Sequence, residues 1–275
     1  MVLSTPSLLI PYPDIGAEIF RIGPFAVRWY ALAYVAGLLL GWRYLLYMAK
    51  RKDARIAERD ADDFLLWATL GVVLGGRLGY VLFYQPLKYA AHPLEIFYVW
   101  QGGMSFHGGL LGVITALILF ARVRRLALFD LTDLVAQIAP LGLLFGRIAN
   151  FINGELWGRP SDVPWAMIFP MDELRVPRHP SQLYEAGLEG VILFATLWLI
   201  RRYVRASRTP GVISGCFLIG YGTARIIGEV FREPDVFLGY LINGSATMGQ
   251  ILSVPMVAFG IGLIWYARRQ ARAGG

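Results

Sequence analysis

The segment GRIANFINGELWG, residues 146–158, carries an arginine, two asparagines and a glutamate at the end of a strongly apolar stretch. Arg147, Asn150 and Gly154 recur at steps of three and four, so they are predicted to share one face of a helix. A guanidinium group stays charged and offers a planar fork that suits phosphate oxygens. One such contact at about 4 Å is worth about 4 kcal/mol at an effective dielectric near 20. The segment therefore predicts a site for a phosphate-bearing molecule.

Two further segments carry residue types that could do chemistry. Tyr221, Arg225 and Glu229 follow one another at steps of four, which predicts a continuous polar stripe on one helix. His107 stands between glycines in QGGMSFHGGLLG, and a histidine there could act as a base, orient a substrate or have only a structural role. Ser105 lacks the GxSxG elbow of a serine nucleophile. With three histidines, no HExxH and no carboxylate-rich cluster, no metal or other cofactor is expected.

The composition places these residues in a membrane protein. Hydrophobic residues make up 56% of the chain and charged residues 16%, with a mean hydropathy of +0.53, whereas about a quarter of the residues are charged in soluble domains. Crossing about 30 Å of hydrocarbon takes about 20 apolar residues. Windows of this kind predict an all-α polytopic membrane protein with seven transmembrane helices, at residues 25–48, 64–84, 104–121, 131–152, 183–199, 211–231 and 246–267.

The basic residues are distributed unevenly over the connections between these windows. Sixteen Lys and Arg residues lie in or beside the first, third and fifth connections and in the C-terminal tail, but only seven lie in or beside the other connections and the N-terminal arm. Since positive residues stay preferentially on the cytoplasmic side, the N-terminus is predicted outside and the C-terminus in the cytoplasm. Basic helix ends facing anionic lipid explain the net charge of +7. Nucleic acid is therefore not an expected partner.

In this orientation the polar residues of the predicted helices fall at one depth. At 1.5 Å rise per residue they lie within about 12 Å of the outer interface. They are Tyr30, Arg77, His107, Arg147, Asn150, Arg225, Glu229 and Gln250. A charge in a span costs about 2.5–3.5 kcal/mol and usually faces a cavity or a partner. Besides a functional cavity, two alternatives stay open. Arg147 and Arg225 could extend to the interface or pair with Glu155 and Glu229, and Arg77 could belong to a structural ion pair.

A single membrane-embedded domain is predicted for residues 1–275. Residues 1–24 lack the basic start and cleavage pattern of a signal peptide and are predicted to form an interfacial arm. Residues 153–182 are predicted to form a small external head, periplasmic or extracellular, between the fourth and fifth helices. A phosphate-bearing molecule reached from the outer leaflet is most simply a phospholipid. The sequence therefore favours an enzyme that positions an acceptor for direct attack on this lipid and stabilises the phosphate leaving group by charge.

Two other classes of protein are possible on these residues. A secondary transporter of an anionic solute would use the arginines for binding only, but transporters usually show paired repeats with broken helices at the bilayer midplane. This sequence shows no repeat, and its polar layer lies off-centre. A non-enzymatic membrane scaffold would use the polar residues only to join helices.

The segment GRIANFINGELWG resembles the signature GRxxNFxNxExxG of the prolipoprotein diacylglyceryl transferase family. Further segments resemble that family in order along nearly the whole chain: VRWYALAY, GGRLGYVLFY, SFHGGLLG, RHPSQLYEA, YGTARIIGEVFREPD and MGQILS. The resemblance implies transfer of the diacylglyceryl group from phosphatidylglycerol to the lipobox cysteine of a prolipoprotein signal peptide. This reaction forms a thioether, releases glycerol phosphate and begins bacterial lipoprotein maturation. It places the chain in the bacterial inner membrane, surrounded by membrane lipids, with the active site towards the outer leaflet.

The resemblance also assigns roles to residues. Arg147 and Arg225 are implied to clamp the phosphate. The acceptor thiol has an unperturbed pKa near 8.5, and His107 or these arginines are implied to favour its thiolate form. The residues implied to line the lipid site are Tyr30, Asn150, Glu155 and Gly158. The residues implied to support it are Arg77, Tyr221, Glu229, Arg232 and Gln250. The group that removes the thiol proton stays open.

Overall fold

The computed structural model describes residues 10–13, 15–16, 18–23, 25–51, 54–204, 209–234, 241 and 246–273. The chain divides into two compact units, a larger one made of Met1–Gly41 with Val135–Gly275 and a smaller one made of Trp42–Leu134. Both units are helical, and helix α1 (Trp29–Ala49) and helix α5 (Leu128–Ile152) each contribute to both.

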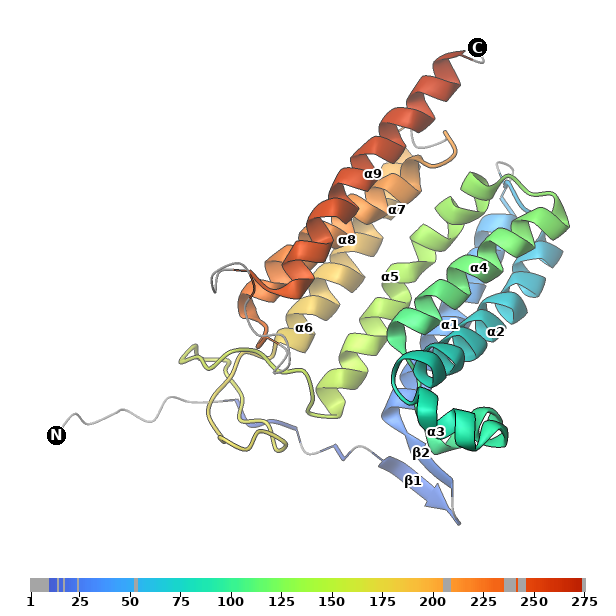
Figure 1. Ribbon diagram of the computed structural model, residues 1–275. Coiled ribbons are helices and arrows are strands. Elements are labelled where there is room, and N and C mark those ends of the chain that lie inside the picture. Colours follow the sequence, from blue (N-terminus) through green and yellow to red (C-terminus); the bar gives the residue numbers. More distant parts are fainter. Residues whose placement is uncertain are drawn as a thin grey trace. The chain divides into compact units, whose positions relative to one another are not determined.

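The smaller unit is built on α2 (Glu58–Phe83) and α4 (Phe106–Arg124), which run side by side (Figure 1). A Cβ on Gly75 would lie 2.7 Å from the Cα of Gly112, so the backbones approach as only glycine allows. Ser105 caps the start of α4, and its hydroxyl accepts a hydrogen bond from the Gly108 amide at 3.2 Å. Between the two helices lie α3 (Pro86–Ala91) and the 3₁₀ turns η1 (Pro93–Phe97) and η2 (Val99–Gln101).

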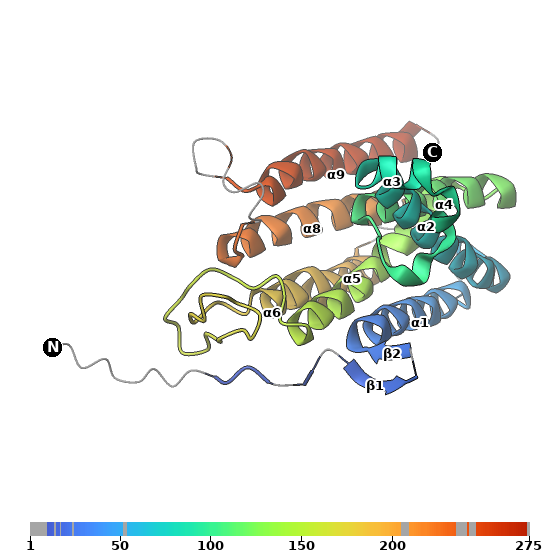
Figure 2. The same cartoon turned by 60° about the horizontal axis from the view of Figure 1, so that its bottom comes forward.

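The larger unit contains the other long helices. α6 (Ser181–Glu185), a π-helical stretch η3 (Ala186–Ile192) and α7 (Leu193–Tyr203) form one continuous helical segment of 23 residues. α8 (Val212–Phe231) and α9 (Met248–Ala273) lie side by side in both views (Figures 1 and 2). The start of α1 packs on α5, where a Cβ on Gly37 would meet the Cα of Gly142 at 3.3 Å.

Six helical segments are long and apolar enough to cross a membrane. They are α1, α2, α4, α5, Ser181–Tyr203 and α9. α8 has the length, with 20 residues, but it carries Arg225 and Glu229, which lower its hydropathy. The prediction of a polytopic helical membrane protein is confirmed, and α8 as the remaining predicted span stays a prediction.

The sequence prediction is wrong at the starts of the first two helices. The first window was expected to be helical from residue 25, but Phe25–Arg28 form strand β2, which pairs antiparallel with β1 (Glu18–Ile22). This hairpin occupies part of the predicted arm, of which residues 1–9, 14, 17 and 24 lie outside the described residues. The chain is therefore not purely α-helical. α2 begins six residues before its predicted window, at Glu58, because acidic residues suit the first turn of a helix.

The predicted head is an irregular segment with its own small core. Phe151, Met167 and Phe169 are buried together, with Tyr12 and Trp157 packed against them. Isolated β-bridges join Pro160 and Met167 to Arg178. Buried Arg178 donates to Asp172 at 2.7 and 3.1 Å, and these hydrogen bonds hold the pKa of the Asp172 carboxyl below its usual range. Helix resumes at Ser181, close to the predicted end of the head.

Candidate functional site

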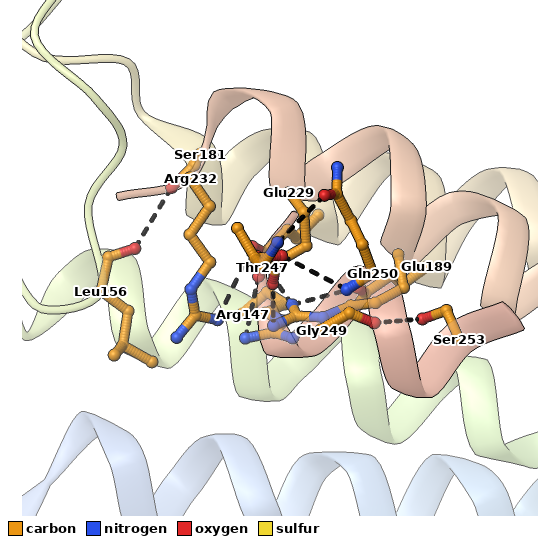
Figure 3. Close-up of polar contacts among 12 residues, drawn as sticks. Arg147, Leu156, Ser181, Glu189, Glu229, Arg232, Thr247, Gly249, Gln250 and Ser253 are labelled. Carbon is orange, nitrogen blue, oxygen red and sulfur yellow. Dashed lines mark hydrogen bonds and ion pairs between the residues drawn. The ribbon is translucent and has the colours of Figure 1, made fainter. Parts of the chain in front are cut away.

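Six charged side chains of the larger unit form one ion-pair network (Figure 3). The network consists of Arg147, Glu185, Glu189, Arg225, Glu229 and Arg232. Its members come from α5, α6, η3, α8 and the residue that ends α8. All six side chains are at most 15% exposed. Charges in such a place need partners, and here they supply them to one another.

Arg147, the arginine of the opening segment, is held by two carboxylates. Its Nη1 lies 2.8 Å from Oε2 of Glu185, and its Nε and Nη2 each donate to Oε2 of Glu189 at 3.1 Å. Neither carboxylate was predicted to contact it. Arg147 is therefore ion-paired within the protein, but with Glu185 and Glu189 and not with Glu155.

Arg225 has a less complete set of partners. Its Nη2 lies 2.5 Å from Oε1 of Glu229, so the pairing that was left open as an alternative occurs here. Its Nη1 lies 3.4 Å from Oε1 of Glu185 and 3.6 Å from Oε1 of Glu189. Nη1 of Arg225 and the Oε1 atoms of Glu185 and Glu189 are buried and lack a hydrogen-bond partner among the described residues. The network thus contains one open donor between two open acceptors.

Glycines and a π-helical turn bring the network together. A Cβ on Gly190 would lie 2.7 Å from the Cβ of Leu144, so η3 approaches α5 closely beside the Glu189–Arg147 pair. A Cβ on Gly249 would lie 2.6 Å from the carboxyl carbon of Glu229, so α9 leaves room for this carboxylate. π-helical turns are rare and occur frequently at functional sites.

The second half of the signature segment ends α5. The amides of Gly154 and Glu155 bond to the carbonyls of Phe151 and Asn150, and Gly154 has φ +66, which is the pattern of a glycine-terminated helix. The Glu155 carboxylate accepts from the Nδ2 atoms of Asn150 at 2.8 Å and Asn153 at 3.3 Å. Glu155 is therefore fixed by amides rather than by an arginine.

Gly158 has a packing role in this structure. A Cβ there would lie 2.7 Å from both the Cβ and the carbonyl oxygen of His179. Gly158 bridges to Arg232. The next residue, Arg159, donates to the carbonyls of Arg232 and Glu229 at 3.0 Å. The head is thus attached to the end of α8, directly beside the network.

Arg77 and Gln250 support local structure. Arg77, buried in the smaller unit, donates to the carbonyls of Glu95 and Gly102 at 2.6 Å and of Ile96 at 2.8 Å. It therefore organises the 3₁₀ turns through carbonyls, and the ion pair that was left open as an alternative does not occur among the described residues. Gln250 and Thr247 exchange side-chain and backbone hydrogen bonds in a capping box at the start of α9.

The remaining predicted residues, His107, Tyr30 and Tyr221, are exposed or half-buried. His107 is exposed on the first turn of α4 in the smaller unit, with its ring 5.5 Å from that of Phe106. Tyr30, half-buried on α1, has its hydroxyl 3.2 Å from that of Tyr34. The half-buried ring of Tyr221 packs beside the apolar core, one turn before Arg225.

Glu185 and Glu189 were missed as functional residues. Their signal was available, since two glutamates stand four residues apart within a predicted apolar window, on one helix face. No group of three or more His, Cys, Asp or Glu side chains in the described ranges is arranged to hold a metal ion.

The fold and the site define a polytopic helical membrane protein with a buried arginine–glutamate network among its helices. A model of the family described as prolipoprotein diacylglyceryl transferase matches residues 17–266. The chain belongs to this family. It is 58% identical over 262 residues to a protein of Rhodospirillum rubrum, with 94% of this chain and 95% of that protein covered.

Two other relatives are similar over almost their whole length. A protein of Paramagnetospirillum magneticum is 57% identical over 266 residues, which cover 96% of this chain and 98% of the relative. A protein of Azospirillum brasilense is 56% identical over 267 residues, covering 97% and 99%. All three relatives are named phosphatidylglycerol–prolipoprotein diacylglyceryl transferase.

Proposed function

We propose that this chain transfers the diacylglyceryl group of phosphatidylglycerol to the lipobox cysteine thiol of a prolipoprotein. Family membership and the names of three relatives with at least 56% identity support this substrate pair. They favour a transferase over an anion transporter or a scaffold. One structural observation carries the proposal to a site, namely the buried Nη1 donor of Arg225 that no described residue satisfies by a hydrogen bond.

The reaction is a substitution at the glycerol carbon that bears the phosphodiester. The thiol loses its proton, the sulfur attacks this carbon, and a carbon–sulfur bond forms while the carbon–oxygen bond to phosphate breaks. The electron pair of that bond leaves with glycerol phosphate. Because negative charge grows on the leaving phosphate, fixed positive groups beside it lower the barrier.

Arg225 and Arg147 are the proposed phosphate clamp. Arg225 offers its open Nη1, and Arg147 still has two N–H groups beyond the three directed at Glu185 and Glu189. Both arginines are held in place by carboxylates before the lipid arrives, so little reorganisation accompanies binding. This preorganisation is the condition for strong electrostatic catalysis.

His107 is the proposed acceptor of the thiol proton. Its ring is exposed on the first turn of α4, beside the ring of Phe106. Tyr30, Asn150 and Glu155 are proposed to line the lipid site. Gly158 is proposed to support this site because it lets the head pack closely against the end of α8. Tyr221 and Gln250, on α8 and α9, and Arg232, at the end of α8, are proposed to support it by holding these helices in place.

The membrane arrangement follows from the same proposal. We take α8 as the seventh span, since its charged residues have partners within the protein. The distribution of basic residues over the connections supports an N-terminus outside and a C-terminus in the cytoplasm. The lipobox cysteine of a secreted protein would then meet the site towards the outer leaflet of the bacterial inner membrane. The match over residues 17–266 supports a single functional domain made of both units.

A reconstituted reaction tests the proposal. Purified protein in detergent would receive phosphatidylglycerol and a lipobox peptide, and peptide mass and glycerol phosphate release would be followed. We expect a diacylglyceryl mass gain on the cysteine peptide and none on its serine analogue. Absence of product with folded, lipid-bound protein would refute transfer and favour the transporter.

A further inference from the structure

The network is electrically balanced before any lipid binds. Three arginines face three glutamates, so the six groups sum to zero when all are ionised. The side chains of Glu185 and Glu189 are only 2% and 0% exposed. A phosphodiester that enters between Arg147 and Arg225 adds one negative charge. In a site of low dielectric, an uncompensated charge is costly.

Two atoms are suited to accept a compensating proton. Oε1 of Glu185 and Oε1 of Glu189 are buried and receive no hydrogen bond from the described residues. Both face the same nitrogen, Nη1 of Arg225, at 3.4 and 3.6 Å. When this nitrogen turns to a phosphate oxygen, the attraction that keeps both carboxylates ionised weakens.

Resting on the proposed function, we infer that the Glu185–Glu189 pair takes up one proton when the phosphate-bearing headgroup binds beside Arg225. The proton comes from solvent and forms one O–H bond on either Oε1 atom, while the lipid keeps all its bonds. The network and the bound lipid then have a total charge of zero, as the empty network had. Because the carboxylates share their arginines, the proton belongs to the pair and is not assigned to one of the two residues.

The neighbours of the pair support this choice of acceptor. Arg147 faces it from α5, and α8 with its end supplies the other nearby titratable and charged groups, which are Tyr221, Arg225, Glu229 and Arg232. Glu229 is the third carboxylate, but its Oε1 is held at 2.5 Å by Nη2 of Arg225. α9 approaches the network at Gly249, whose uncharged backbone lies beside the Glu229 carboxylate. The two open oxygens are thus the sites at which a proton meets least competition.

Calorimetry counts this proton directly. Full-length protein in detergent would be titrated with a short-chain phosphatidylglycerol, without acceptor peptide, in two buffers of different ionisation enthalpy. The difference in heat divided by the difference in ionisation enthalpy gives the protons taken up. We expect about one proton per lipid, and an affinity that weakens up to about tenfold per pH unit where the empty pair is ionised.

Variants assign the proton to the pair. Glu189→Gln mimics the protonated state, so we expect proton uptake to fall to about zero and the affinity to become independent of pH. Glu185→Gln is the second test, in case the first variant does not fold. Glu95→Gln is the matched control, because this carboxylate pairs with Lys88 at the surface of the smaller unit and should leave the proton count unchanged. A neutral diacylglycerol of the same chain length should bring in no proton.

The outcomes separate the two proposals. A wild-type protein that binds phosphatidylglycerol and forms the thioether, but takes up no proton, overturns the inference alone. Proton uptake that persists in both glutamine variants also overturns it. Absence of phosphatidylglycerol-dependent thioether product refutes the proposed function, whatever the proton count.

Discussion

Replacement of Arg147 by glutamine removes the cation that two buried carboxylates share. Three of its nitrogens lie 2.8–3.1 Å from Glu185 and Glu189. Each contact at about 3 Å is worth about 5 kcal/mol of gross attraction at an effective dielectric of about 20, before desolvation is subtracted. Breaking a buried pair by removing one partner costs about 3–5 kcal/mol net. We therefore expect Arg147→Gln to lower the free energy of unfolding by about this amount and to abolish transfer.

A second substitution separates the loss of stability from the loss of chemistry. Arg147→Gln leaves the network with one excess negative charge, and adding Glu189→Gln restores neutrality. The double variant should therefore regain most of the lost stability but remain inactive, because the clamp arginine is absent. Unfolding would be followed by tryptophan fluorescence during titration with denaturing detergent, and transfer by peptide mass. A single variant as stable as wild type would refute the buried-pair argument, and an active double variant would refute the clamp.

Three further predictions concern the surroundings of the network. Gly158→Ala should detach the head and increase its proteolysis, whereas Gly146→Ala, which faces open space, should not; equal proteolysis would contradict the packing role. Arg77→Met should increase hydrogen exchange over residues 95–103, since the carbonyls of Glu95 and Gly102 lose their donor; unchanged exchange there would disprove this. Because the pKa of Asp172 is lowered, its pairing with Arg178 stabilises the head fully above the ordinary carboxyl pKa of about 4, and this stabilisation is lost as the pH falls further. Hydrogen exchange in the head should therefore rise at acidic pH, and Asp172→Asn should remove this pH dependence; a pH dependence that persists in the variant would contradict the pairing.

The positions of the long helices could be predicted from the sequence because the hydrocarbon thickness fixes their length. The arm could not be predicted equally well, since strand β2 at Phe25–Arg28 is as apolar as the helix that follows it. Hydropathy does not distinguish a short strand from a helix start. The pairing with β1 across a turn at Gly23 decides the conformation there.

The arginines of the candidate site and Glu229 were predictable, but Glu185 and Glu189 were not. Arg147 and Arg225 stand out because arginine is costly in an apolar window. Glu185 and Glu189 are equally unusual in composition, but their relation to Arg147 depends on contacts between helices more than 35 residues apart in sequence. The open atoms of Arg225, Glu185 and Glu189 depend on geometry of a few tenths of an ångström. A spacing rule contains no such information.

The balance of the network connects membrane insertion with turnover. Single charges in a span cost about 2.5–3.5 kcal/mol each, so arginines that arrived without glutamates would weaken the fold that must hold them. Paired with glutamates, they remain charged and ordered, but a phosphate must compete with carboxylates for the same N–H groups. A proton on Glu185 or Glu189 shifts this competition towards the lipid. When the proton leaves with glycerol phosphate, both carboxylates are ionised again and pair with the arginines. This pairing favours release of the product.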